Sequence, residues 1–275
     1  MLKALFSLAT FSLLISTIHA QNRDSSLILS NRMGLIESSR TVIKGGFMLE
    51  GGLLYFYDKQ KGAQGAEIHH NFMTLPRLRL SYGVTKFMEV SVEESFSHLN
   101  VTSNTGYSES LSFSRYRFGL KFNLTKQNGI IPQSALSVSE RLRITNINTV
   151  EFSPILNFSW NYKWGTHVNL SGDITYTFNK QVGDDVNVGL RLGYDFKNKI
   201  GVYSEVYLVG HNLSTAMVSA GLNYQVSSRL VLSAGVGTDV LLYNERPSLS
   251  NILGVNVGVS FLLNNPNKET KKRKR

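Results

Sequence analysis

The sequence predicts an all-β protein, a transmembrane up-and-down β-barrel of about twelve antiparallel strands. Three observations lead to this fold class: a short apolar leader, a two-residue alternation that recurs along most of the chain, and strands long enough to cross a bilayer at a tilt. After the leader, no apolar run approaches the eighteen or so residues that a membrane-spanning helix needs. The chain has no cysteine, which excludes disulfides and cysteine-based zinc sites.

Residues 1–20 are predicted to be a signal peptide. A short basic start around Lys3 is followed by an apolar stretch over residues 4–14, and Ala20 ends a plausible cleavage site. An uncleaved anchor helix is the alternative, but the apolar stretch is short for one. We therefore expect the protein to be exported from the cytoplasm. Residues 21–45, which show no strand pattern, are expected to form a periplasmic N-terminal segment that either hangs in the periplasm or folds into the barrel mouth.

The alternation of apolar and polar residues predicts the barrel over residues 46–263. In residues 185–196 every second residue is apolar, and those between are polar or small. Because neighbouring strand residues point to opposite faces, such a strand has one wholly apolar face. Runs of ten to fourteen residues and polar faces rich in Gly, Ser and Asn favour a membrane barrel over a soluble β-sandwich, which has shorter strands.

Twelve strands with this alternation can be counted, four of them longer than fourteen residues. They cover residues 46–58, 68–83, 86–99, 108–124, 131–145, 149–163, 166–179, 185–197, 200–210, 214–227, 230–243 and 250–263. An even number of strands is usual in bacterial barrels and places both termini in the periplasm. The connections expected on the periplasmic side are short, whereas several of the others are longer and rich in Gly, Ser, Asn and Lys.

The net charge of +10 does not indicate a nucleic-acid-binding protein. Lys3 leaves with the leader, and residues 268–275 carry six bases and one acid, so +4 remains for residues 21–267. Residues 264–275 are expected to form a basic, disordered tail, separated from the last strand by Pro266.

Charged residues of the barrel fall on the polar face of each predicted strand, which indicates the lumen. A charge at the middle of the lipid face costs about 2–4 kcal/mol, so this placement supports the register. Neighbouring strands are expected to pair Glu50 and Glu89 with Arg77 and Arg79. The predicted inward acids are Glu50, Glu89, Glu93, Glu151, Asp173, Asp195, Glu205 and Asp239, and the predicted inward bases are Arg77, Arg79, Arg115, Arg117, Lys121, Arg141, Arg143 and Arg191.

Two roles are open for these charges. They either fill and hold a narrow lumen, or they line a polar conduit or solute site, for which twelve strands leave room. An enzyme is not expected. The candidate bases are His69, His70, His98, His167 and His211; the adjacent His69 and His70 have no partnered serine motif nearby, and Gly-x-Ser-x-Gly is absent. No cofactor or metal site is expected.

Several stretches carry a family resemblance: residues 31–34, 42–52 with Glu50-Gly51-Gly52, 75–84 with Pro76-Arg77, and Gly119-Leu120-Lys121 with Pro132. They resemble a family of outer-membrane transporter barrels that is named after the MetA-pathway of phenol degradation. Later, Glu205-Val206-Tyr207 and residues 258–263 are similar to further strand signatures. Asn31 and Met33 depart from the opening motif, Ser81 replaces an expected Arg, and the last strand does not end on an aromatic residue.

The resemblance implies a transporter-like barrel with poorly defined substrates. Our functional hypothesis is an outer-membrane barrel of transporter or porin type that moves small polar or amphipathic solutes. A structural barrel closed by ion pairs is the alternative, and a lipid-modifying enzyme is less favoured. The expected partners are outer-membrane lipid, the barrel-assembly machinery and a small solute of unknown identity, but no nucleic acid.

Overall fold

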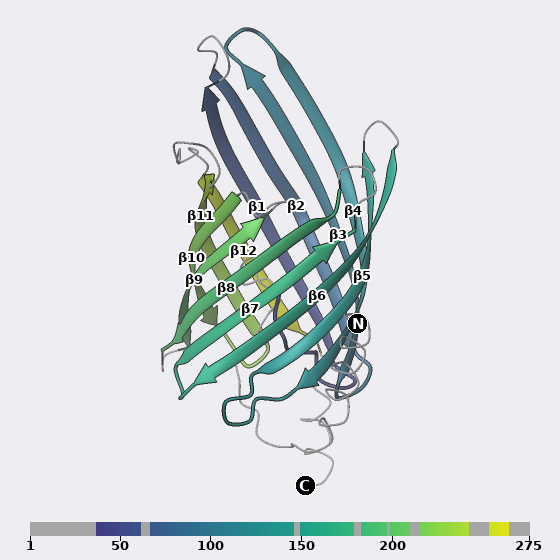
Figure 1. Cartoon of the computed structure of the whole chain (residues 1–275), viewed down its shortest axis with the longest axis vertical. Helices are drawn as coiled ribbons and strands as arrows, with labels where there is room; N and C mark the ends of the chain where they lie inside the picture. Colours follow the sequence, from purple (N-terminus) through teal and green to yellow (C-terminus); the bar gives the residue numbers. More distant parts are fainter. Residues whose placement is uncertain are drawn as a thin grey trace, which may run out of the picture.

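The computed structural model describes residues 37–61, 67–145, 149–178, 183–196, 199–209, 215–241 and 253–263. Its strands form a closed antiparallel barrel in which each strand pairs with its neighbours in sequence, and β1 pairs with β12 to close the ring (Figure 1). The strands are β1 Phe47–Lys61, β2 Glu67–Gly83, β3 Met88–Ser103, β4 Ser108–Thr125, β5 Gln133–Thr145, β6 Val150–Trp164, β7 Val168–Thr177, β8 Asp185–Asp195, β9 Ile200–Val209, β10 Thr215–Gln225, β11 Leu230–Leu241 and β12 Leu253–Leu262. The predicted fold class is confirmed. The described residues contain no helix of the length and apolarity needed to cross a membrane.

The strand bounds agree with the alternation pattern to within three residues, except that β3 runs four residues further. Strands β1 to β4, of 15 to 18 residues, are long and rise beyond the rest at one end of the barrel (Figure 1). The opposite end carries the start of β1 and the end of β12. We call it the proximal end, and the raised end the distal end.

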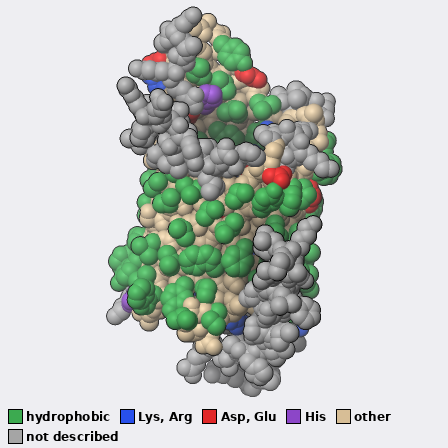
Figure 2. Space-filling model, in the orientation of Figure 1, with side chains coloured by type: hydrophobic (Ala, Val, Ile, Leu, Met, Phe, Trp, Pro, Cys, Tyr) green, Lys and Arg blue, Asp and Glu red, His purple; other side chains and the backbone are tan. Residues whose placement is uncertain are grey.

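The barrel is polar inside and apolar outside. Its described side chains include 25 buried polar or charged residues but only 9 buried hydrophobic ones, the reverse of a water-soluble fold. On β8, Leu190 and Leu192 are 53% and 58% exposed, while Arg191 between them points inward to Glu205. Figure 2 shows hydrophobic side chains spread over the strands of the visible face, with few charged ones. This outer wall suits lipid contact.

Irregular pairing interrupts the ladder at one level of the barrel. The register shifts between Gly52 and Leu54 where β1 meets β2, and between Thr74 and Arg77 where β2 meets β3. Pro76 lies in the second shift, and its lack of an N–H prevents a regular ladder there. Because the bulge reverses which side chains of β2 point inward, Thr74 and Arg77, three positions apart, both reach the interior cavity that Leu54 lines.

A charge placed on the outer wall tests the assignment of the faces. We expect Leu190→Arg, at the middle of β8, to lower the free energy of unfolding by about 2–4 kcal/mol because the guanidinium would face lipid. Denaturant unfolding in lipid vesicles measures this. Ser228→Arg, in the short connection between β10 and β11, adds the same charge and should leave stability nearly unchanged. Equal effects of the two variants would contradict the assignment.

Candidate functional site

The residues before β1 turn back into the barrel instead of leaving it. Gly45 has a φ of 74°, and its N–H donates to the carbonyl of Gly83 at 2.7 Å. The N–H of Gly46 donates to the carbonyl of Ile43 at 2.8 Å. A Cβ on Gly83 would lie 2.2 Å from the carbonyl oxygen of Ile43. Only glycine at 83 therefore lets this turn pack against the end of β2.

Residues 37–42, which we call the plug segment, are held across the proximal lumen by the barrel wall. The N–H of Val42 donates to Glu89 Oε2 at 2.8 Å. Lys121 Nζ donates to the carbonyl of Ser38 at 2.9 Å, and Asn123 Nδ2 donates to Thr41 Oγ1 at 2.6 Å. Of the two positions expected for residues 21–45, the described part takes the one inside the barrel mouth; residues 21–36 lie outside the described residues.

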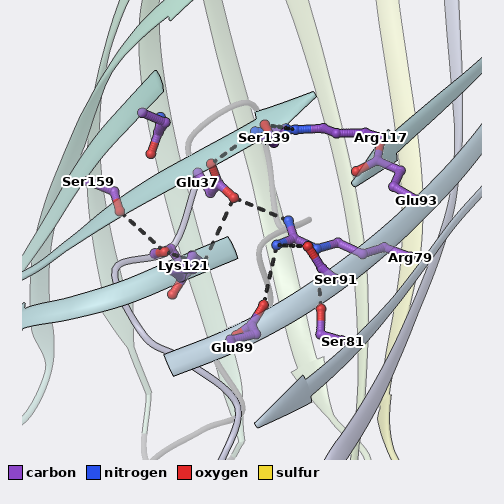
Figure 3. A network of polar contacts seen from close by, with 12 residues as sticks. Glu37, Arg79, Ser81, Glu89, Ser91, Glu93, Arg117, Lys121, Ser139 and Ser159 are labelled. Atoms are coloured by element: carbon purple, nitrogen blue, oxygen red, sulfur yellow. Dashed lines mark hydrogen bonds and ion pairs between the residues drawn. The ribbon is translucent and has the colours of Figure 1, made fainter. Parts of the chain in front are cut away.

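Glu37 is the centre of the polar network (Figure 3). Its carboxylate lies 3.2 Å from Arg79 Nη1, 3.7 Å from Arg117 Nη2 and 3.9 Å from Lys121 Nζ. Arg79 also contacts Glu89 Oε1 at 3.3 Å and Glu50 Oε2 at 4.0 Å. Three cations thus face three carboxylates, and one of the three carboxylates comes from the plug segment.

The charges around Glu37 keep it ionised. Burial alone would raise the pKa of its carboxyl, but the positive charges of Arg117, Lys121 and Arg79 outweigh burial and lower the pKa to about 2. Its own N–H donates to Asp173 Oδ2 on the opposite side of the barrel, at 3.4 Å. Glu37 therefore connects the β2–β4 wall to β7.

A second space lies beyond this layer, toward the distal end. It is a cavity of about 140 Å³. Arginines from three strands surround it, together with an apolar patch from β1 and β2. Its lining residues are Leu54, Phe72, Thr74, Arg77, Glu93, Ser95, Arg115, Arg117 and Arg141. We call it the arginine cavity. Arg117 lies between this cavity and Glu37.

The remaining inward charges form separate pairs. Arg191 Nε donates to Glu205 Oε1 at 2.6 Å, and Ser219 donates to Glu205 Oε2 at 3.0 Å. Arg143 Nη1 lies 3.4 Å from Glu151 Oε2. Asp195 accepts from Asn169 at 2.7 Å. The side chain of Asp239 lies outside the described ones. Most of the predicted inward residues thus have a partner within the lumen.

The predicted pairing of Glu50 and Glu89 with both Arg77 and Arg79 is wrong for Arg77. Arg79 contacts both acids, whereas Arg77 pairs with Glu93 at 3.2 Å. The register explains this, because Arg79 lies directly opposite Glu50 and Glu93, whereas Arg77 lies two residues further along β2, opposite Gly52 and Ser95. An alternation pattern gives the inward face of a strand but not its register with the next strand, so sequence alone could not assign these partners.

Two acids depart from the inward pattern. Glu94 pairs with Tyr116 in register and accepts a hydrogen bond from the Tyr116 hydroxyl, on the face that also carries Val92 and Phe96. Glu140 pairs with Phe118 and Pro154 on the outer face. Sequence reasoning did not single out these residues. Glu94 directly follows the inward Glu93, and Glu140 directly precedes the inward Arg141. Because neighbouring strand residues point to opposite faces, this spacing is the signal that places both acids on the outer face.

His69 and His98 contact polar side chains, but the described side chains around them do not form a catalytic triad. His98 Nδ1 lies 2.7 Å from Ser112 Oγ on the outer wall, a pair that sequence reasoning missed, and its Nε2 lies 3.4 Å from Ser110 Oγ. Among the described side chains no carboxylate orients His98, as a catalytic triad would require. His69 contacts Tyr57 and Glu67; His211 lies outside the described residues. No group of three metal-ligating side chains occurs in the described ranges.

Comparison with known proteins agrees with this architecture. A family model described as "Putative MetA-pathway of phenol degradation" matches residues 80–245. The structure is similar to an outer membrane channel from Pseudomonas putida F1, with a TM-score of 0.53 and 14% identity over 82% of this chain and 98% of that one. It is also similar to the transport unit of the autotransporter AIDA-I from Escherichia coli, with a TM-score of 0.50 and 11% identity over 85% and 95%. No curated protein matches the sequence.

Removing the charge of Glu37 should release the plug segment. Glu37→Gln leaves the three cations facing two carboxylates, so we expect trypsin to cut at Arg40 about tenfold faster or more, as the loss of a charged hydrogen-bond partner implies. Electrophoresis of timed digests of the folded barrel measures the rate. Glu109→Gln, near the distal connection between β3 and β4, removes the same charge elsewhere and is the control. An unchanged rate in Glu37→Gln would show that Glu37 does not hold the segment.

Acid should release the same segment only at low pH. A carboxyl whose folded pKa lies below its unfolded value contributes stability above the unfolded pKa, near 4.5, and this contribution is lost as the pH falls through about 2. Hydrogen–deuterium exchange of residues 37–46, corrected for intrinsic rates, should stay flat from pH 7 to about 4.5 and then accelerate in the wild type. In Glu37→Gln this acid-dependent acceleration should be largely absent.

Proposed function

The chain belongs to the family described as the MetA-pathway of phenol degradation, and from this premise we propose that it is an outer-membrane channel for small polar or amphipathic solutes. In this proposal the plug segment closes the lumen at the proximal end. The observation that carries the proposal is that this segment lies inside the barrel and is held to several strands of the wall through non-covalent contacts.

The inner wall is suited to passage once the plug segment leaves. Besides its charged side chains, the space next to the plug segment is lined by small polar ones, among them Ser91, Ser137 and Ser139. Ser159 donates to the carbonyl of Ser38 at 3.4 Å, so its hydroxyl contacts the segment. A twelve-strand barrel is wider than an eight-strand barrel, whose own side chains fill it. Removal of residues 37–42 would therefore leave a polar passage.

The inward charges divide into two groups with different roles. Glu50, Arg79, Glu89 and Lys121 contact the plug segment or each other and stabilise the closed state. Arg77, Arg115, Arg117 and Arg141 line the arginine cavity, where a solute would meet them. In this proposal the inward charges thus have both roles: one group holds the lumen closed, and the other lines the path of the solute at a second level.

We place the proximal end in the periplasm and the distal end outside the cell. The proximal connections between β2 and β3 and between β6 and β7 are short, as periplasmic turns usually are. The raised strands β1 to β4 then project outward. The leader and the basic tail lie outside the described residues, and contact with the barrel-assembly machinery stays a prediction.

A structural barrel without transport is the second candidate. The observation that favours it is the balance of charge at the level of Glu37, where three cations meet three carboxylates. Such a layer stabilises a sealed lumen. The two candidates differ in what happens when the plug segment is removed.

Removal of residues 21–41 should open the channel. We expect the intact mature protein to show low conductance in planar bilayers and the shortened protein a conductance several times higher, because the plug segment no longer crosses the lumen. A protein lacking residues 264–275 should behave as the intact one does. Absence of conductance and of solute flux into liposomes in every form, with the barrel folded, would favour the structural candidate.

A further inference from the structure

The arginine cavity has two unlike walls. Leu54 and Phe72 form an apolar side, and Phe72 stacks on Phe113 with ring centroids 6.3 Å apart. Arginines form the other side. The guanidinium of Arg115 lies 4.6 Å from the Phe113 ring centre, and that of Arg143 lies 4.4 Å from it. These contacts hold the cations at the boundary between aromatic and polar surface.

The cavity carries more positive charge than its own acids compensate. Arg77 pairs with Glu93, and Arg117 is 3.7 Å from Glu37. Among the side chains that the structure describes, no carboxylate lies within ion-pair distance of Arg115 or Arg141. Charges held away from bulk water are costly unless they are paired. A bound anion would supply the missing partner.

The size and shape of the cavity restrict this anion. A volume of about 140 Å³ corresponds to roughly five water molecules at ~30 Å³ each. That is too small for an oligosaccharide or a peptide. The apolar side would gain nothing from an inorganic anion, whereas a compact apolar group would cover Leu54 and Phe72 and displace water from them.

We propose that the arginine cavity binds a small organic carboxylate, with its carboxyl group at Arg115 and Arg141 and its apolar body against Leu54 and Phe72. Guanidinium groups suit this role because their planar donors match the two oxygens of a carboxylate. The plug segment offers a precedent within the chain, since Glu37 places a carboxylate against the other side of Arg117. This inference rests on the proposed function and gives the channel its solute class.

The wild-type protein tests the proposal first. Isothermal titration of the full mature chain in detergent uses benzoate, benzyl alcohol, acetate and sulfate. We expect saturable binding of one benzoate, and binding at least tenfold weaker for benzyl alcohol, which lacks the charge, and for acetate, which lacks the apolar body. Sulfate binding as tight as that of benzoate would show an inorganic-anion site. Equal binding of benzyl alcohol would show an apolar site, and either result, or no binding, would overturn the proposal.

Variants locate the site. Arg115→Gln and Arg141→Gln should each weaken benzoate binding about tenfold or more, since each removes a charged hydrogen-bond donor. Arg229→Gln, in the connection between β10 and β11, makes the same change outside the cavity and should bind as the wild type does. Heat-modifiable mobility in gels confirms that each variant is folded; if one is not, the wild-type series decides alone. An equal effect of all three substitutions would overturn the assignment.

The channel and the binding site can fail separately. Benzoate binding without conductance or flux in the protein shortened by residues 21–41 would contradict the proposed channel and leave the binding site standing. Conductance in that shortened protein without benzoate binding in the full chain would contradict the carboxylate site and leave the channel standing.

Discussion

The contact of Glu37 with Arg79, Arg117 and Lys121 is the interaction on which the closed lumen depends. A barrel in lipid turns its polar surface inward, so its charges must find partners inside a narrow space. Among the described wall carboxylates, Glu50 and Glu89 contact Arg79, whereas Glu93 pairs with Arg77. A further carboxylate, that of Glu37, comes from outside the barrel strands. The positive charge of the wall thus creates a position that the plug segment fills through a residue that stays ionised.

The strands could be predicted because the membrane imposes a strict rule on them. Lipid on one side and a polar lumen on the other force every second residue to be apolar, as on β8 with Leu190 and Leu192. That rule is local, so it is visible in the sequence. It also assigns the inward face of residues such as Glu205. It does not show the register between two strands, and the partner of Arg77 was therefore predicted incorrectly.

A place in the barrel mouth was one of two positions expected for the plug segment, but its contacts there could not be predicted, for a different reason. Its contacts join residues far apart in the chain, such as Ser38 with Lys121, and it follows no periodic pattern that would indicate them. The signals that exist are single residues. Gly83 must lack a side chain because the carbonyl of Ile43 lies where its Cβ would be, and Gly45 takes a positive φ to reverse the chain. Neither residue differs in the sequence from a glycine that relieves crowding inside the barrel.

The lumen is uneven around its circumference. Arginines gather on β2, β4 and β5, whereas the facing wall has Asp173, the Arg191–Glu205 pair and glycines that make room for Tyr203, whose hydroxyl would lie 2.4 Å from a Cβ on Gly221. Arg117 lies between the plug segment and the arginine cavity, because its guanidinium contacts Glu37 and its side chain also lines the cavity. A carboxylate held at Arg115 and Arg141 would bring a second negative charge close to Arg117, which Glu37 already contacts. Because the two negative charges repel each other, occupancy of the cavity and closure by the plug segment are expected to oppose each other, and by linkage the opposition acts equally in both directions.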